Sequence, residues 1–341
     1  MRLIKGNNAN EVWTKCCGIL LGHSGYEECK TRLGPARELL HVSLTIRKPR
    51  QRWVVSRIPA INPAFALAEL VWIYSGSNEA NLIYRWNPAL PKFAGKGRFY
   101  HGAYGYRLRH RFGLDQLERA FHILRNQPDS RQVVLQLWGG AIDLPAPSGA
   151  PVSNDIPCNI VSILKVRDGR LDWTQIIRSN DLYLGLPYNL ALFTALQEVM
   201  AGWLDIEIGE YNQVSDSLHL YETDAQKIRI TPGSSIANTD RLDLKKHESD
   251  EAFAKLMENM RYMAKTKISQ ECLLKRITTG SLPTPYKNIG LIMGADIARR
   301  EKWFDLADEL ANLCTNPALR VLWQKWQKRQ NNLITSFNGR K

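Results

Sequence analysis

A thiol, a guanidinium, a carboxylate and a carboxamide occur close together in this 341-residue chain. Cys158 stands in Asp155-Ile-Pro-Cys158-Asn159, and Arg178-Ser-Asn-Asp181-Leu-Tyr-Leu-Gly185-Leu-Pro-Tyr-Asn189 follows shortly after it. A positive charge near a cysteine favours the thiolate, which is a nucleophile at neutral pH. We therefore expect Arg178 to activate Cys158. Such a set of side chains can attack and orient a small anionic heterocycle.

The two stretches resemble the motifs of the thymidylate synthase family, in which a Pro-Cys pair is followed by Arg-Ser-x-Asp-x-x-x-Gly-x-Pro-Phe/Tyr-Asn. The resemblance covers roughly residues 30 to 225. It implies a folate-dependent enzyme that transfers a one-carbon unit from 5,10-methylenetetrahydrofolate to C5 of a pyrimidine nucleotide. In that family the cysteine aligned with Cys158 adds to C6 of the ring, which makes C5 nucleophilic.

Two further catalytic residues follow from the resemblance. Glu69, in Leu67-Ala-Glu-Leu-Val-Trp72, matches the catalytic glutamate of the family, and Tyr104, in His101-Gly-Ala-Tyr-Gly-Tyr106, matches a tyrosine of the proton steps. A glutamate in so apolar a helix is costly without polar partners, so we expect an ordered water network around it. From the residues alone, Glu69 could instead be an exposed glutamate on a polar stripe of the helix.

The resemblance also implies a binding site for deoxyuridylate (dUMP). Its residues are Arg32, Arg131, Arg178, Ser179, Asn189, His219 and Tyr221. The three arginines and Ser179 would bind phosphate, with Arg37 as the alternative to Arg32. In the family, the arginine aligned with Arg131 reaches the partner subunit, which implies a homodimer. Gln132 stands where a second arginine is usual.

Base and sugar recognition are assigned to three of these residues. The Asn189 amide offers a donor and an acceptor that complement O4 and N3-H of uracil. Relatives that hydroxymethylate deoxycytidylate have an aspartate there, so Asn189 favours a uracil base. As an isolated residue it could instead cap a helix. His219 and Tyr221 are two apart on an expected strand, so both side chains can reach one sugar.

Three residues are assigned to the folate: Asp181 anchors the pterin ring, and Gly185 and Tyr188 stand beside it. Departures from the family leave the reaction outcome open. Asn159 replaces a common histidine, Ile177 replaces a common glutamine, and a basic helical region replaces a short apolar tail. Methylation of dUMP to dTMP is the leading expectation. Hydroxymethylation, in which water captures the same methylene intermediate, is the alternative.

Composition and charge are those of a globular protein with anionic partners. The chain has 44% hydrophobic residues, 23% charged residues and a formal charge of +13. Its six cysteines lack metal-ligand spacing, and the sequence contains no apolar run long enough for a membrane span, so we expect free thiols, no metal and a cytoplasmic protein.

A nucleic-acid-binding or regulatory protein on the same fold is a further alternative, because Trp323 and Trp326 lie among basic residues. Docking of Leu322 and Trp326 onto the body is the competing interpretation.

The expected fold is α+β. The resemblance implies a layered thymidylate synthase-like domain over residues 1–235, with a large mixed sheet at the dimer interface, and a helical C-terminal extension follows over 236–341. Asp168-Gly169 predicts a hairpin between Ile160–Val166 and Leu171–Ile177, and an earlier hairpin is expected between His41–Ile46 and Trp53–Arg57. Periodicity predicts these helices: Ala64–Ser75, Leu114–Asn126, Asn189–Trp203, Asp250–Thr266 and Ala298–Leu313.

Overall fold

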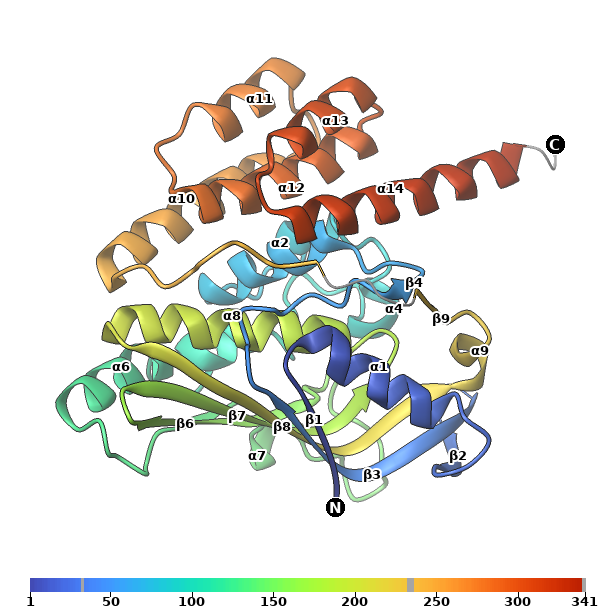
Figure 1. Ribbon diagram of the computed structural model, residues 1–341, viewed down its shortest axis with the longest axis vertical. Helices are drawn as coiled ribbons and strands as arrows, with labels where there is room; N and C mark the ends of the chain where they lie inside the picture. The colour runs from blue at the N-terminus through green and yellow to red at the C-terminus, as the bar shows by residue number, and fades with distance from the viewer. Residues whose placement is uncertain (32–33, 232–235, 339–341) are drawn as a thin grey trace.

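A seven-stranded mixed sheet forms the base of the molecule, and helices pack over one of its faces (Figure 1). The computed structural model describes residues 1–31, 34–231 and 236–338, with side chains through residue 330. The strand order is β1-β3-β8-β7-β6-β5, with β2 paired to β3. The strands are β1 (Arg2–Gly6), β2 (Glu27–Thr31), β3 (Gly34–Ile46), β5 (Val134–Gln136), β6 (Asn159–Arg167), β7 (Arg170–Asp181) and β8 (Glu207–Tyr221). The β1–β3 and β7–β8 pairs are parallel, and the other pairs are antiparallel.

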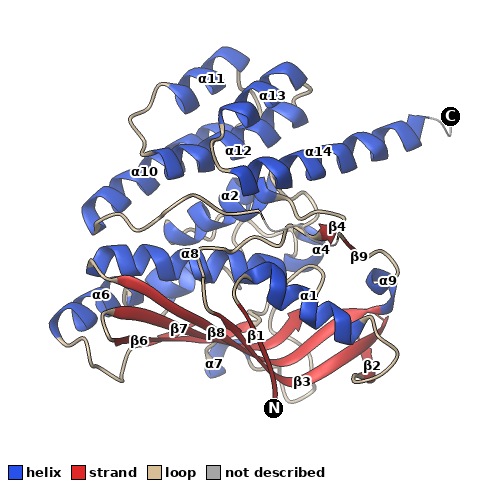
Figure 2. Cartoon of the chain, in the orientation of Figure 1, coloured by secondary structure: helices blue, strands red, loops and turns tan. Residues whose placement is uncertain are grey.

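Helices and strands are segregated, with the strands gathered on one side of the molecule (Figure 2). This arrangement confirms the expected α+β class. A two-stranded sheet of β4 (Arg57–Ile58) and β9 (Arg229–Ile230) lies apart from the large one. The helices are α1 (Ala9–Leu20), α2 (Pro63–Tyr74), α3 (Ala80–Tyr84), α4 (Pro91–Ala94), α5 (Tyr104–Tyr106) with a π-helical turn (Arg107–Arg111), α6 (Gln116–Asn126), α7 (Gly140–Asp143), α8 (Leu186–Leu204), α9 (Glu222–Ala225), α10 (Lys246–Met263), α11 (Gln270–Thr278), α12 (Thr284–Arg300), α13 (Phe304–Leu313) and α14 (Pro317–Asn338).

One of the two predicted hairpins is confirmed. Strands β6 and β7 pair directly across Asp168 and Gly169, whose φ values of 50° and 67° suit a tight two-residue turn. The earlier hairpin is wrong. Segment 53–56 forms no strand, and β3 pairs instead with β1, β2 and β8. The Lys48-Pro49-Arg50 turn therefore follows the end of β3, and the chain after it does not return as a strand paired with β3.

The two helices that matter most for the site are buried on almost every side. In α2 the Asn62 side chain accepts from the Phe65 N–H at 3.2 Å and Pro63 occupies the first turn, as predicted. Every residue of α2 except Glu69 is buried. Helix α8 lies between the sheet and α2 (Figure 1), so it too has an apolar surface all round.

Helices α10 to α14 stack on the far side of α2 from the sheet (Figure 1). The predicted helix Ala298–Leu313 is wrong, because the backbone breaks between α12 and α13 at Lys302, where φ is 65°. Leu322 and Trp323 are buried, and the Lys325 Nζ donates to the Val55 carbonyl at 2.8 Å. The first half of α14 is therefore docked on the body, as the competing interpretation expected. The boundary at residues 235 and 236 stays a prediction.

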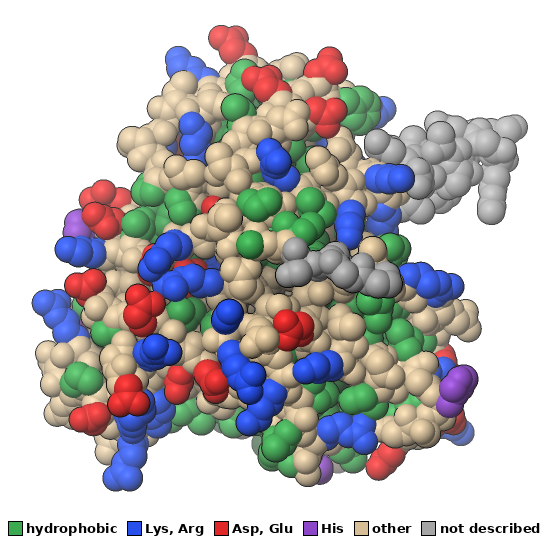
Figure 3. All heavy atoms as spheres, in the orientation of Figure 1, with side chains coloured by type: hydrophobic (Ala, Val, Ile, Leu, Met, Phe, Trp, Pro, Cys, Tyr) green, Lys and Arg blue, Asp and Glu red, His purple; other side chains and the backbone are tan. Residues whose placement is uncertain are grey.

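The charged residues are spread over the surface. Figure 3 shows Lys and Arg interspersed with Asp and Glu on the face that it displays.

No helix in the described part of the chain is long and apolar enough to cross a membrane.

A buried ion cluster joins α8 to the segment that leads into α10. Glu198 of α8 is fully buried and accepts from Arg50 Nε at 2.6 Å and from Arg52 Nη2. Arg50 Nη2 also donates to Asp243 at 2.7 Å. Removing one partner of such a cluster leaves an uncompensated charge in the interior, which costs more than the cluster itself contributes.

We expect Glu198→Gln to lower the free energy of unfolding by roughly 3–5 kcal/mol, because Arg52 then stays buried without a counter-charge. Urea unfolding monitored by tryptophan fluorescence measures the change. The matched control is Glu207→Gln, whose exposed carboxylate is 3.6 Å from Arg50 Nη1 and contributes little. Equal stabilities of the two variants would contradict this role for Glu198.

Candidate active site

The strand register brings the two sequence motifs to one end of the sheet. Cys158 directly precedes β6, while Arg178 to Asp181 end β7. The Arg178 N–H donates to the Cys158 carbonyl at 2.9 Å. In the parallel β7–β8 pair, Asp181 lies opposite His219. Residues far apart in the sequence therefore meet where β7 and β8 end and β6 begins.

The Arg178 side chain fixes the loop that carries Cys158. Its Nε donates to the Pro157 carbonyl at 3.0 Å and its Nη2 to the Ile156 carbonyl at 3.4 Å. The guanidinium carbon lies 5.3 Å from the centroid of the Trp138 ring. Nη1 makes no hydrogen bond within the described part of the chain, so it remains available to an anion.

The expected ionisation of Cys158 by Arg178 is wrong for the folded chain. Burial raises the pKa of the thiol, and Asp155 and Asp181 add to that effect. The Arg178 charge lowers the pKa, but by less than burial raises it. The neutral thiol is therefore the favoured form of Cys158.

Glu69 is the half-buried exception on the otherwise buried helix α2. Burial raises the pKa of its carboxyl group from 4.5 to about 8. It makes no hydrogen bond to the residues that the structure describes. The alternative of an exposed glutamate on a polar stripe is wrong, and the carboxyl group is protonated at neutral pH.

Tyr104 begins α5, and its ring lies 6.1 Å from that of Phe193 on α8. Burial raises the pKa of its phenol, the charges of Cys158 and Glu69 add to this, and neighbouring Asn159 opposes it. Tyr104 therefore lies within electrostatic reach of both Cys158 and Glu69. Each of them is neutral at rest.

Asn189 lies in the first turn of α8, where its Nδ2 donates to Asn180 Oδ1 at 3.3 Å. The N-cap of α8 is Gly185, so the helix-cap interpretation of Asn189 is wrong. Asn180 is buried and in turn donates to Ser215 Oγ at 3.1 Å. Sequence reasoning missed Asn180 as the residue that orients Asn189. Its position between Ser179 and Asp181 was the available signal.

Asp181 and Tyr188 fit a planar heterocycle in different ways. Asp181 Oδ1 accepts from the Tyr183 and Leu184 N–H groups at 2.6 and 3.1 Å, which leaves Oδ2 for a donor. The Tyr188 hydroxyl accepts from the Asn62 N–H at 2.9 Å, so its ring is held as a wall. A Cβ at Gly185 would lie 3.0 Å from Asn180 Oδ1 and the Asp181 carbonyl. Close packing of this turn therefore requires the glycine.

The remaining predicted binding residues are not all brought together. The His219 and Tyr221 rings lie 5.1 Å apart on one face of β8, as predicted. Arg131 is exposed near the other end of β6, where its carbonyl accepts from Lys165 Nζ at 3.1 Å. Arg32 lies outside the described residues. Its alternative, Arg37, forms a salt bridge with Glu222 at 2.7 Å, so its guanidinium already has a carboxylate partner within the protein.

A buried arginine beside the site was also missed. Arg57 is 2% exposed and stacks over the Tyr183 ring at 4.1 Å, with Asp181 and Tyr188 within electrostatic reach. It forms no ion pair within the described part of the chain. Burial lowers the pKa of its guanidinium. No periodicity marked this residue, because it begins the two-residue strand β4 after irregular chain.

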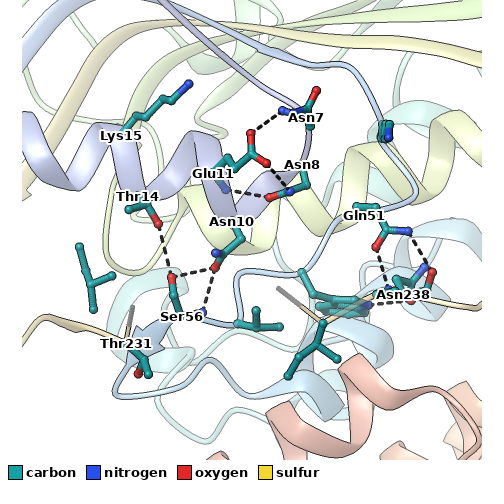
Figure 4. Close-up of a pocket in the computed structure, with 16 residues that line it drawn as sticks. Asn7, Asn8, Asn10, Glu11, Thr14, Lys15, Gln51, Ser56, Thr231 and Asn238 are labelled. Atoms are coloured by element: carbon teal, nitrogen blue, oxygen red, sulfur yellow. Dashed lines mark hydrogen bonds between the residues drawn. The ribbon is translucent and has the colours of Figure 1, made fainter. Parts of the chain in front are cut away.

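A separate cavity of about 690 Å³ is lined by the N-terminal half of α1 and by segments near residues 51–56 and 236–238. Figure 4 shows that its amides are paired with neighbouring protein groups, Asn8 with Glu11 and Gln51 with Asn238. None of the predicted site residues lines it. The cavity is therefore distinct from the cluster around Cys158.

Comparisons with known proteins show which family the chain resembles. The family model described as "Thymidylate synthase" matches residues 57–272. The deoxyuridylate hydroxymethyltransferase of Bacillus phage SP01 is 33% identical over 202 residues, which are 55% of this chain and 51% of that protein. The enzyme of the same name from Pseudomonas phage M6 is 34% identical over 189 residues, 55% and 52% of the two chains. A protein named "Putative thymidylate synthase" from Methanothermobacter thermautotrophicus is 28% identical over 223 residues, 64% and 93% of the two chains.

Strands β5 to β8 of the mixed sheet and the cluster of residues at their ends lie within the region that the family model matches. The chain belongs to the thymidylate synthase family. It spans about half the length of the two phage relatives.

We expect Glu69→Gln to flatten the pH dependence of stability. The native carboxyl group keeps its proton up to about pH 8 while the unfolded one loses it near 4.5, so wild-type stability falls as pH rises between these values. Urea unfolding across that range measures the slope. Glu248→Gln, at an exposed position of α10, should retain it. Identical slopes in wild type and Glu69→Gln would contradict a protonated Glu69.

Proposed function

We propose that the protein transfers a one-carbon unit from methylenetetrahydrofolate to C5 of dUMP, and that 5-hydroxymethyl-dUMP is the product. The observation that supports the transfer reaction is that Tyr104 lies within electrostatic reach of both Cys158 and Glu69, while Asn180, near the end of β7 that adjoins Cys158, holds the amide of Asn189. A thiol, two buried proton donors and a base-reading amide are what addition to a uracil ring requires.

The resting protonation states of Glu69 and Tyr104 suit a nucleophilic addition to the base. Cys158 adds through sulfur to C6, and negative charge develops at O4 as the ring becomes an enolate. A protonated Glu69 can donate to that oxygen directly or through water. Tyr104, also protonated, can hold the water that takes the C5 proton. Burial makes each of these interactions stronger than in water.

Substrate binding would use donors and acceptors at the ends of β7 and β8. Arg178 Nη1, with the Ser179 hydroxyl, would bind the phosphate. Asn189 Nδ2 is held by Asn180, so its Oδ1 is oriented to accept N3-H of uracil. His219 and Tyr221 lie on one face of β8, where both can reach a sugar hydroxyl.

Methylenetetrahydrofolate supplies the one-carbon unit and, for a methyl product, also the hydride. Asp181 Oδ2 would accept from a ring N–H of the pterin, and the Tyr188 ring would form one wall. The tight turn at Gly185 keeps Asp181 at the start of α8.

The choice of product rests on the relatives. Both phage relatives are named for hydroxymethylation of deoxyuridylate, at 33% and 34% identity, which supports that outcome. Methylation, the leading expectation from sequence, is the second candidate. It is supported by the Methanothermobacter relative, 93% of which aligns with this chain.

We also propose a homodimer through the open face of the large sheet. Helices α1 and α8 pack against its other face (Figure 1). On the open face Val134 is 50% exposed, and Ile163, Ile176 and Val214 are partly exposed beside it. An apolar patch on a sheet favours association. Arg131, away from its own Cys158, would complete the phosphate site of the partner.

Mass analysis of the pyrimidine formed from dUMP and methylenetetrahydrofolate tests the function. We expect the hydroxymethyl product without dihydrofolate. Cys158→Ser should abolish turnover while retaining dUMP binding, because a serine hydroxyl is a much poorer nucleophile. A methyl product with dihydrofolate would move the assignment to the second candidate. Unchanged turnover of Cys158→Ser would overturn the mechanism.

Mixing two inactive variants tests the dimer. Arg131→Ala lacks the shared cation and Cys158→Ser lacks the nucleophile, so each homodimer should turn over slowly. A mixed dimer contains one site with both residues intact. We expect activity to return on mixing after subunit exchange. If activity stays at the level of the separate variants, Arg131 does not serve a partner's site.

A further inference from the structure

Asp155 carries a half-buried carboxyl group three residues before the proposed nucleophile, and none of the roles above uses it. Its Oδ2 accepts from the Gly102 N–H at 2.7 Å. A Cβ at Gly102 would lie 2.9 Å from both the Asp155 carbonyl and its Oδ1. The absence of a side chain at Gly102 is therefore what lets the carboxyl group approach the segment that carries Tyr104.

The surroundings of Asp155 place its charge within the reacting cluster. Its charge acts on Tyr100, Tyr104 and Cys158. The cations that act on it are His101 and Arg107.

Both cations already have a counter-charge in Asp143, which is fully buried. His101 Nε2 lies 2.7 Å from Asp143 Oδ1, and Arg107 forms two bonds to the same carboxylate at 2.7 and 2.8 Å. Asp155 therefore has no ion pair of its own among the described residues. Burial raises its pKa, which makes the carboxylate a stronger base.

One oxygen of Asp155 is left without a partner. Oδ1 makes no hydrogen bond within the described part of the chain, yet it is not sealed from solvent. A carboxylate oxygen held in place on one side and open on the other is suited to bind a water molecule and accept its proton.

We propose that Asp155 holds and deprotonates the water that captures the methylene group. This inference rests on the proposed hydroxymethyl function. After transfer of the one-carbon unit, C5 carries an exocyclic CH2 group conjugated to the C4 carbonyl, and C6 carries the Cys158 sulfur. The water oxygen forms a bond to the CH2 carbon and its proton passes to Asp155, while the C5=CH2 electrons move into the O4 enolate. The enolate then forms the C5=C6 bond, and the C6–S bond breaks to release the thiolate.

A small added thiol separates this role from a structural one. A thiolate is already ionised and adds to the same CH2 carbon without a base, which gives a thioether at C5. Asp155→Asn keeps the shape and can still accept from Gly102, but it cannot take a proton. Asp168→Asn, in the β6–β7 turn, is the matched control for loss of a carboxylate.

Each protein is incubated with dUMP, methylenetetrahydrofolate and 2-mercaptoethanol, and the products are separated by mass. We expect Asp155→Asn to lose hydroxymethyl product by about 10²-fold or more while forming the thioether at the wild-type rate. Asp168→Asn should resemble wild type. With 5-fluoro-dUMP, which cannot lose its C5 substituent as a cation, Asp155→Asn should still form the covalent protein adduct seen by intact mass.

The outcomes are distinct. Undiminished hydroxymethyl product in Asp155→Asn overturns the inference. Equal loss of both products, or of the fluorinated adduct, also overturns it, because Asp155 would then support the earlier steps or the loop. A wild-type protein that releases only thymidylate and dihydrofolate overturns the proposed function itself. The wild-type protein alone gives that result, so it is distinguished from a failure of the Asp155 inference.

Discussion

The parallel register between β7 and β8 is the constraint on which the site depends. It places Ser179 beside Ser217 and Asp181 beside His219, so that the motif at the end of β7 and the pair His219 and Tyr221 share one end of the sheet. The antiparallel pairing of β6 with β7 then brings Cys158 beside Arg178. A slip of one residue would turn every one of these side chains to the opposite face. The tight turn at Asp168 and Gly169 fixes the β6–β7 register from the other end of the hairpin.

Burial sets the electrostatics of the cluster. The pKa values of Cys158, Glu69, Tyr104 and Asp155 are all raised, and desolvation is the largest cause in each case. Burial therefore favours the protonated forms of Cys158, Glu69 and Tyr104, and it makes the Asp155 carboxylate a stronger base. The Arg178 charge lowers the pKa of the Cys158 thiol, but by less than burial raises it.

Local signals in the sequence were sufficient for much of the fold. The cap at Asn62, the turn at Asp168-Gly169 and the apolar run of α8 each predict an element that the structure contains. The β3 pairing could not be predicted from its neighbours, because its partners are strands far along the chain. The break before α13 was also missed, since a single left-handed residue at Lys302 ends the helical pattern without a glycine or proline.

For the site, motif spacing predicted which residues converge but not their charge states. The expectation that Arg178 ionises Cys158 considered one neighbour and left out burial, which only the folded chain reveals. The orienting role of Asn180 and the close approach of Gly102 to Asp155 depend on contacts between segments. Residues such as these have ordinary local sequence and acquire their role from tertiary structure.

Helix α2 serves two neighbours at once. One side carries Glu69 within electrostatic reach of Tyr104, and other sides pack against α8 and α12. A helix with this placement has no face that is free to vary. A change of side-chain volume in α12, far from any substrate, must be absorbed by α2 or passed on to the position of Glu69. The C-terminal helices are therefore expected to evolve in step with the catalytic half, and exchange of these helices between homologues would succeed only when α2 is exchanged with them.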